Sequence, residues 1–176
     1  MSAQEIIFAG FGGQGTLSMG KFLAYAGMDA NMNVSWLPSY GPEMRGGTAN
    51  CSVILSDEPV GSPIINDPNT LVVMNRPSLD KFEASLVKGG LLIMDSDLVD
   101  RKPNRDDIEV ISVPAQTEAM NIGSKQIANM VLLGALVKRT GIVSMEELVS
   151  ALKAHGKEKF FEINKKALEI GASYVK

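Results

Sequence analysis

The chain has 176 residues, of which 45% are hydrophobic and 21% are charged, and its formal net charge is −3 at pH 7. This length and composition predict one soluble globular domain over residues 1–176, long enough to bury a substantial core. The weakly acidic balance argues against a general nucleic-acid binder, because such proteins carry a basic patch or stripe.

Cys51 is the only cysteine of the sequence. An iron–sulfur cluster needs about four thiolates, so we expect no cluster held by this chain alone. A disulfide framework is excluded in the same way, which fits a reducing compartment. The first residues lack a secretion signal, and the longest apolar run, around residues 130–137, is far shorter than the ~20 residues of a membrane span. We therefore expect a cytoplasmic protein that does not contact a membrane.

The first part of the chain has the pattern of a sheet with one covering helix. Ile6–Ala9 is a continuously apolar run and predicts a strand buried on both faces. Helical spacing of apolar residues follows as far as about Ala30. Val34–Leu37 predicts a second strand that ends at Pro38, and Ala49–Leu55 alternates like a strand with one face covered.

The middle of the chain supplies three further strands. They are the apolar runs Leu71–Met74, Leu91–Met94 and Val110–Val113. Between the first two, Leu79, Phe82 and Leu86 form a helical stripe, which predicts a helix that ends at Gly89–Gly90.

The last third is predicted to be helical. Ile127–Arg139 is apolar around most of its circumference and predicts a buried helix. Ser144 and Glu147 have the spacing of a capping box, and a further helix is expected to end at Gly171. The alternation of strands and helices predicts a three-layer α/β/α fold with a Rossmann-like first strand, turn and helix. Because no crossover helix precedes Ala49–Leu55, the sheet is predicted to be mixed, mainly parallel.

A glycine-rich turn, Gly10-Phe11-Gly12-Gly13-Gln14-Gly15, joins the first strand to the first helix. It fits the dinucleotide fingerprint, in which glycines permit positive φ and the helix N-terminus presents N–H groups to an anion. The fingerprint also expects an acidic residue after the second strand, where this chain has Leu37-Pro38-Ser39-Tyr40. A nicotinamide site is therefore disfavoured, and a tight turn without a ligand stays an alternative.

A second segment, Ser39–Thr48, reads Ser-Tyr-Gly-Pro-Glu-Met-Arg-Gly-Gly-Thr. An arginine beside two glycines can place its fork against a phosphate or a carboxylate while the backbone approaches closely. Long loops in compact domains are usually functional, which favours a binding role. The alternative is that Glu43 and Arg45 pair with each other or with the first turn and fix a long surface loop. The predicted cofactor-binding residues of the two segments are Gly12, Gly13, Gln14, Gly15, Arg45, Gly46, Gly47 and Thr48.

No other residues form a catalytic or metal-binding pattern. Asp95 and Asp97 follow a strand and are interpreted as turn formers. His155 is interpreted as a solvated or capping histidine near a helix end, and Cys51 as a packed side chain. We predict no catalytic residue and no metal ligand in this chain.

The two glycine-containing segments together resemble the gamma subunit of 2-oxoacid:ferredoxin oxidoreductases. Three further stretches agree with this family in order and position, so that the resemblance covers nearly the whole chain. They are Ile54–Pro63, Leu71–Pro77 and Asn129–Leu136.

The resemblance implies an enzyme that converts a 2-oxoacid and coenzyme A to an acyl-CoA and carbon dioxide while ferredoxin is reduced. In this family, thiamine diphosphate and iron–sulfur clusters belong mainly to other subunits, so no cofactor is expected on this chain alone. The implied partners are the alpha, beta and delta-type subunits, with ferredoxin reached through the complex. The isolated chain is expected to be inactive. The resemblance places the Gly12–Gly15 turn and the Tyr40–Thr48 loop toward the complex, and we hypothesise that Arg45 binds the coenzyme A phosphates.

Several questions stay open at this stage. The family includes enzymes for pyruvate, 2-oxoglutarate, branched-chain 2-oxoacids and indolepyruvate, of which we favour 2-oxoglutarate. A chain of this size, without a fused ferredoxin domain, fits a multi-subunit enzyme. One alternative is a free-standing NAD(P)-dependent enzyme that uses the glycine turn. Another is a regulatory module that binds a nucleotide or an acyl-CoA.

Overall fold

The computed structural model describes residues 3–39 and 48–176 of the chain. The strands are β1 (Gln4–Phe11), β2 (Asn33–Ser39), β3 (Thr48–Ser56), β4 (Thr70–Val73), β5 (Leu91–Asp95) and β6 (Glu109–Val113). The α-helices are α1 (Thr16–Asp29), α2 (Arg76–Phe82), α3 (Ala115–Ile122), α4 (Ala128–Thr140), α5 (Met145–His155) and α6 (Phe161–Ser173). Short 3-10 turns are η1 (Glu83–Ser85), η2 (Lys125–Ile127) and η3 (Glu158–Phe160).

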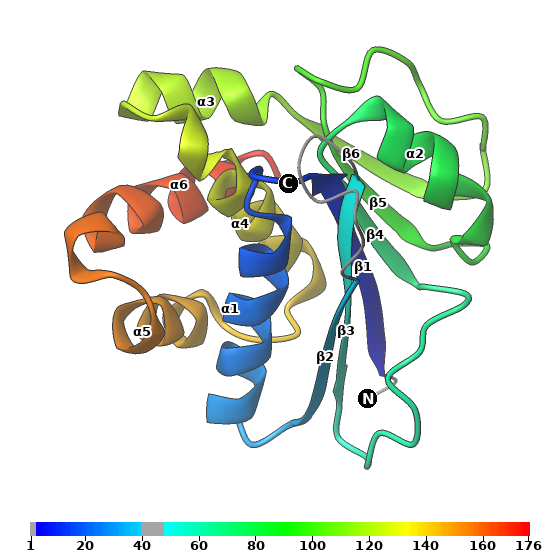
Figure 1. Cartoon of the computed structure of the whole chain (residues 1–176), viewed down its shortest axis with the longest axis horizontal. Coiled ribbons are helices and arrows are strands. Elements are labelled where there is room, and N and C mark those ends of the chain that lie inside the picture. The colour runs from blue at the N-terminus through cyan, green and yellow to red at the C-terminus, as the bar shows by residue number, and fades with distance from the viewer. Residues whose placement is uncertain (1–2, 40–47) are drawn as a thin grey trace.

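The strands form one sheet in the order β2-β3-β1-β4-β5-β6 (Figure 1). Strands β1, β4, β5 and β6 are parallel to one another, whereas β3 is antiparallel to both β1 and β2. This arrangement confirms the predicted mixed, mainly parallel sheet. The apolar runs of β1, β4 and β5 are buried because both faces of this part of the sheet are covered, whereas Val110 of the edge strand β6 is 38% exposed.

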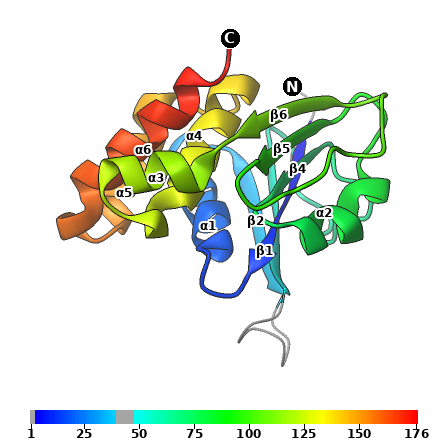
Figure 2. The same cartoon turned by 90° about the horizontal axis from the view of Figure 1, so that it is seen from above.

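The two faces of the sheet are covered unequally. Helices α1, α3, α4, α5 and α6 lie on one face, and α2 lies on the other (Figures 1 and 2). We call these the helical face and the α2 face. The structure thus has the predicted three layers, with most of the helical mass on one side.

The larger hydrophobic core fills the helical face and draws on every helix of that side. Ile6 and Phe8 of β1 and Val53 and Leu55 of β3 point into it, with no exposed surface or almost none. The smaller core on the α2 face combines residues of β1, β4 and β5 with Leu79 of α2 and Val99. Ile7 and Ala9 of β1 point to this second core, as the two-residue period of a strand requires.

Helices α4 and α6 cross with their backbones in contact. A Cβ atom at Gly171 of α6 would overlap the carbonyl oxygen of Val131, and one at Gly134 of α4 would overlap the carbonyl group of Leu168. Two glycines, one on each helix, therefore allow an approach that no other residue permits. The predicted role of Gly171 as a C-cap is wrong, because α6 continues to Ser173.

Two other expectations about element ends need correction. Pro38 lies within β2 and does not end it, because β2 is the edge strand and needs no N–H bond outward. Helix α2 ends at Phe82 and is followed by η1, so Gly89–Gly90 belongs to the turn before β5 and Leu86 packs from outside the helix. Helix α3 was not predicted at all.

An ion-pair network fastens the segment after β5 to α2. The guanidinium of Arg101 donates to Asp80 and to Glu83, each at 2.7 Å. Glu83 is 8% exposed and also accepts from the backbone N–H of Asn104, while Arg105 donates to the carbonyl oxygens of Glu83 and Leu86. The network supplies polar partners for the Glu83 carboxylate, whose burial without them would carry a large desolvation free energy.

Candidate functional site

The glycine turn between β1 and α1 is closed by the side chain of Gln14. Its Oε1 accepts from the backbone N–H of Phe11 at 2.6 Å, and its backbone N–H donates to the Phe11 carbonyl at 3.2 Å. The same Oε1 lies 3.4 Å from the amide nitrogen of Asn75, which caps α2. Gln14 therefore points inward and joins the turn to the β4–α2 junction.

The glycines of the turn serve different purposes. Gly13 and Gly15 have φ values of 87° and 76°, which favour glycine. A Cβ at Gly15 would also overlap the side chain of Asn129, whose amide donates to the Gly15 carbonyl at 3.1 Å. A Cβ at Gly13 would meet nothing within 4 Å. The turn thus has a packed side at Gly15 and an open side at Gly13.

Helix α1 begins at Thr16 without a side-chain hydrogen bond at its N-cap and without an acidic residue in its first turn. Its first N–H groups and its dipole therefore favour a negatively charged group at this end. The hydroxyl of Thr16 does not serve that purpose, since it is buried and lies 3.8 Å from the Met74 sulfur. What the turn offers is backbone N–H groups.

The sheet register brings the two predicted segments together. Phe11, at the start of the turn, is the partner of Thr48, which ends the second segment. Ser39, which begins that segment, is paired with Asn50 of β3. Both ends of the second segment therefore lie at the C-terminal end of β1, where the glycine turn begins. Arg45, Gly46 and Gly47 lie outside the described residues, as does the alternative Glu43–Arg45 pair.

The strand order also bears on the dinucleotide alternative. In a Rossmann site the acid that binds the ribose follows the strand beside β1 on the crossover side. Here the antiparallel strand β3 lies between β1 and β2, and its residues beside the turn are Thr48, Ala49 and Asn50. None of these three is acidic, which agrees with the disfavoured nicotinamide site.

Asp95 and Asp97 hold the N-terminus of α3. Asp95 is fully buried and accepts from the backbone N–H groups of Ala115 and Asp97 and from the side chain of Gln116. Burial raises the pKa of the Asp95 carboxyl above its ordinary value. Asp97 accepts from the backbone and hydroxyl of Thr117. The interpretation as turn formers is confirmed, and the capping of α3 is an additional role.

Two other side chains behave as the sequence predicts. Cys51 is fully buried, and this burial raises the pKa of its thiol to about 12, so it stays protonated. His155 ends α5 with an exposed side chain and stacks on Tyr25, with ring centroids 3.8 Å apart.

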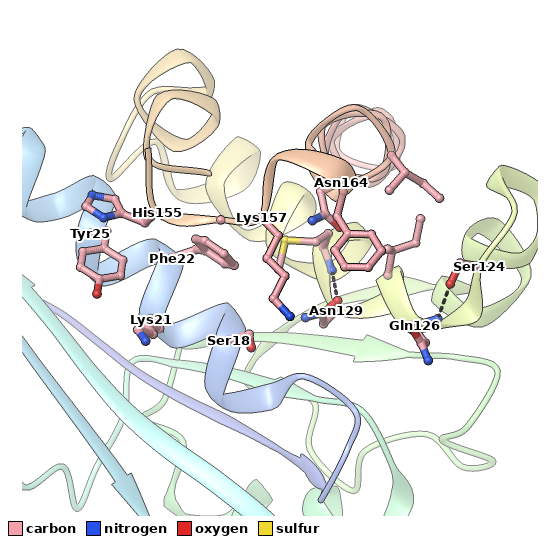
Figure 3. A pocket seen from close by; sticks show the side chains of 15 residues that line it. Ser18, Lys21, Phe22, Tyr25, Ser124, Gln126, Asn129, His155, Lys157 and Asn164 are labelled. Atoms are coloured by element: carbon pink, nitrogen blue, oxygen red, sulfur yellow. Dashed lines mark hydrogen bonds between the residues drawn. The ribbon is translucent and has the colours of Figure 1, made fainter. Parts of the chain in front are cut away.

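A pocket of about 410 Å³ opens between α1, the start of α4 and the link from α5 to α6 (Figure 3). It adjoins the glycine turn through Asn129, which lines it and binds Gly15. From the sequence, His155 was interpreted as a solvated or capping side chain, and Ile127, Asn129 and Met130 fell in a predicted helix, but none was predicted to line a pocket. The available signal was Phe22 and Tyr25, aromatic residues on α1 that only partly join the core.

Within residues 3–39 and 48–176, no group of three or more histidine, cysteine, aspartate or glutamate side chains is placed to hold a metal ion. Over the same residues, no helix is both long and apolar enough to cross a membrane.

Comparison with known proteins identifies the family. Residues 5–174 match the pyruvate ferredoxin/flavodoxin oxidoreductase family. The chain is 34% identical to the gamma subunit of a keto/oxoacid ferredoxin oxidoreductase from Geobacter sulfurreducens, whose crystal structure superposes with a TM-score of 0.86 over 97% of both chains. This α/β chain, with its glycine turn before α1, therefore belongs to the pyruvate ferredoxin/flavodoxin oxidoreductase family.

Two curated relatives are similar in sequence. The ketoisovalerate oxidoreductase subunit VorA of Methanothermobacter marburgensis is 41% identical over 98% of this chain and 36% of its own length. The 2-oxoglutarate synthase subunit KorC of Methanocaldococcus jannaschii is 36% identical over 85% of this chain and 81% of its own. The chain thus spans only about a third of the VorA relative but most of the KorC relative.

Proposed function

We propose that this chain is the gamma subunit of a multi-subunit 2-oxoacid:ferredoxin oxidoreductase, which forms an acyl-CoA by oxidative decarboxylation of a 2-oxoacid. The observation that carries the proposal is the match, over 97% of both chains, to a protein solved as a gamma subunit. KorC, a 2-oxoglutarate synthase subunit, also matches over most of its length.

The chain's own residues agree with a division of labour between subunits. Cys51 is a single thiol, fully buried and protonated, and does not fit an iron–sulfur cluster. Thiamine diphosphate, the clusters and the reaction with ferredoxin would then belong to alpha, beta and delta-type partners, with this chain acting in the cytoplasm without catalytic residues of its own. We expect the isolated chain to be inactive.

A tagged full-length chain, expressed in its native cells, tests this proposal. We expect it to co-purify with larger subunits that bind thiamine diphosphate and iron–sulfur clusters, and the purified complex to reduce ferredoxin with a 2-oxoacid and coenzyme A. Recovery of the chain without any thiamine enzyme would contradict the proposal and favour the regulatory module.

Assays of the same purified complex identify the substrate. We propose 2-oxoglutarate, as the KorC relative acts in a 2-oxoglutarate synthase, while the higher identity to VorA favours ketoisovalerate as the second candidate. Assays with 2-oxoglutarate, ketoisovalerate and pyruvate at equal concentrations should give the highest kcat/KM with 2-oxoglutarate. The highest value with another 2-oxoacid would replace our assignment and leave the subunit role intact.

We further propose that the glycine turn and the second segment, with Gly12, Gly13, Gln14, Gly15, Gly46, Gly47 and Thr48, form one wall of a shared site. The pairing of Phe11 with Thr48 and the uncapped start of α1 support this proposal. Arg45 would supply the cation for the coenzyme A phosphates.

Substitution of Arg45 in the complex tests its role. We expect Arg45→Ala to raise the KM for coenzyme A about tenfold or more, as loss of a charge-assisted phosphate contact does, with the KM for the 2-oxoacid unchanged. Arg139→Ala is a matched control, since Arg139 pairs with Glu109 at the start of β6, away from the turn. An unchanged KM for coenzyme A in Arg45→Ala would refute the assignment.

A further inference from the structure

The pocket beside α1 is built from one face of that helix. Ser18, Lys21, Phe22 and Tyr25 recur at spacings of three and four residues and line its wall. This face points away from β3, which α1 contacts through small residues: a Cβ at Gly20 would lie 2.5 Å from the Cys51 sulfur. The spacing therefore leaves a polar and aromatic face of α1 turned toward the pocket.

The other walls come from two segments far along the chain. The start of α4 contributes Asn129, which is held in place by its bond to the Gly15 carbonyl, and Met130. The link between α5 and α6 contributes His155, Lys157 and Phe160. Three segments thus converge on one concave surface, with Asn129 among its lining residues (Figure 3).

Two lysines of this pocket have no acidic partner. Lys21 and Lys157 are exposed, and neither ammonium group lies within 4 Å of a carboxylate among the residues described. In Figure 3 the ammonium of Lys157 points toward Asn129 and the middle of the pocket. Over the described part of the chain, no acidic residue lines the pocket, and Asp29 lies 3.8 Å from His155 at its outer end. The Lys21 ammonium lies 5.9 Å from the Tyr25 ring centroid and has no carboxylate partner within the described residues, so two cations without an acidic partner in one cavity favour an anionic ligand.

Aromatic side chains supply the apolar part of the same cavity. Tyr25 and His155 stack with planes 7° apart, and Phe22 and Phe160 line the wall, with Phe160 42% exposed. The side-chain amides of Gln126 and Asn164 also face the cavity without a partner in the described chain. Flat rings beside amide groups are suited to a planar heteroaromatic ligand.

We propose that this pocket binds a small ligand that joins a planar aromatic ring to a phosphate, of the class of a nucleoside monophosphate. Lys21 and Lys157 would bind the phosphate, and the aromatic side chains would contact the ring. A free phosphate would leave the apolar walls exposed, and the volume of about 410 Å³ lies within the usual range for small-molecule sites, about 300–1,000 Å³. The proposal does not depend on the assembly proposed above.

Calorimetric titration of the full chain with AMP tests the proposal. We expect saturable one-to-one binding of AMP. Orthophosphate and adenosine should each bind at least tenfold more weakly, because orthophosphate lacks the ring and adenosine lacks the phosphate. Binding of orthophosphate or adenosine as tight as that of AMP would overturn the proposal, as would the absence of saturable AMP binding.

Substitutions assign the binding to this pocket. Lys157→Gln should weaken AMP binding about tenfold, and Lys21→Gln with Lys157→Gln should weaken it further. Phe160→Ser should weaken AMP binding without affecting the weak binding of orthophosphate. The charge-matched control is Lys102→Gln with Lys138→Gln, two exposed lysines outside the pocket. An unchanged AMP affinity in the Lys21/Lys157 variant, with an unchanged melting temperature, would refute the site.

Discussion

The two faces of the sheet are held in different ways. On the helical face, apolar side chains form one core from β2 to β6, and α4 and α6 touch backbone to backbone. On the α2 face, a small apolar core and a network of ion pairs cover β4 and β5. There Leu37 of β2 is 41% exposed beside its partner Ser52. The stability of the fold is therefore concentrated on the helical face, and surface left open for contacts is concentrated at the sheet edge of β2 and β3.

The largest expected effect is at the α4–α6 crossing. Gly171→Ala would place a Cβ against the backbone of Val131, which can move only if the two helices separate. We expect the free energy of unfolding to fall by about 3 kcal/mol or more, measured by urea denaturation. The matched control is Gly61→Ala, because a Cβ there meets nothing within 4 Å. A loss at Gly171 as small as the control's would contradict the crossing described above.

Two leucines on neighbouring strands compare the faces directly. Leu55 of β3 is fully buried in the larger core, whereas Leu37 of β2 is 41% exposed on the α2 face. Leu55→Ala should lower the free energy of unfolding by about 3 kcal/mol, and Leu37→Ala by no more than about 0.5 kcal/mol. Chemical denaturation of both variants measures the contrast, and similar losses would mean that Leu37 is covered in the folded protein.

The nearly buried carboxylate of Glu83 should contribute more to the free energy of unfolding than an exposed ion pair does. Glu83→Ala removes a nearly buried carboxylate that binds Arg101 and the backbone of Asn104, and we expect a loss of about 2 kcal/mol. The exposed pair Glu109–Arg139 provides the control, since Glu109→Ala should cost about 0.5 kcal/mol or less. Equal losses in the two variants, measured by thermal unfolding, would show that burial of Glu83 has no energetic effect.

The smallest expected effect concerns the pH dependence of stability. Because the pKa of Asp95 is raised in the folded chain, the folded state binds more protons than the unfolded state between the ordinary pKa of 3.8 and the raised value. Stability from Asp95 is therefore fully present below pH 3.8 and falls as the pH rises through that window.

Asp95→Asn tests this sign. Asparagine retains the oxygen that accepts from Ala115 and Asp97 but cannot ionise. The difference in unfolding free energy between the wild type and Asp95→Asn should shift against the wild type as the pH rises above 3.8. Taking the difference removes the opposite slope of Asp107 and Glu109, whose pKa values are lowered by Arg105 and Arg139. A difference that is flat with pH, or that shifts toward the wild type, would contradict the raised pKa.

The strands could be predicted because their signal is local. Buried runs such as Ile6–Ala9 are apolar at every position. The alternation of residues in β3 is that of the antiparallel strand beside the parallel part of the sheet. Helix α3 could not be predicted, because only Ala115 and Ala119 of it are buried and its N-terminus is capped by Asp95 and Asp97 from another segment. Gly171 was misread for a related reason: its partner, Val131, is forty residues away.

The candidate site was predicted in part. The glycine turn has a local pattern, and its position between β1 and α1 is confirmed. That Phe11 and Thr48 are neighbours depends on the register of β1 with β3, which sequence spacing does not give. The pocket is formed by three segments with no shared motif, so the sequence does not show that its lysines and aromatic residues lie together.

The bond between Asn129 and Gly15 has a consequence for the order of folding. It joins residues 114 positions apart, so a chain leaving the ribosome has made every strand before the partner of its first turn is synthesised. The turn can take its final shape only when α4 docks, late in synthesis. Early fragments would then hold a sheet whose glycine turn is not yet fixed, and this end of the sheet would mature last.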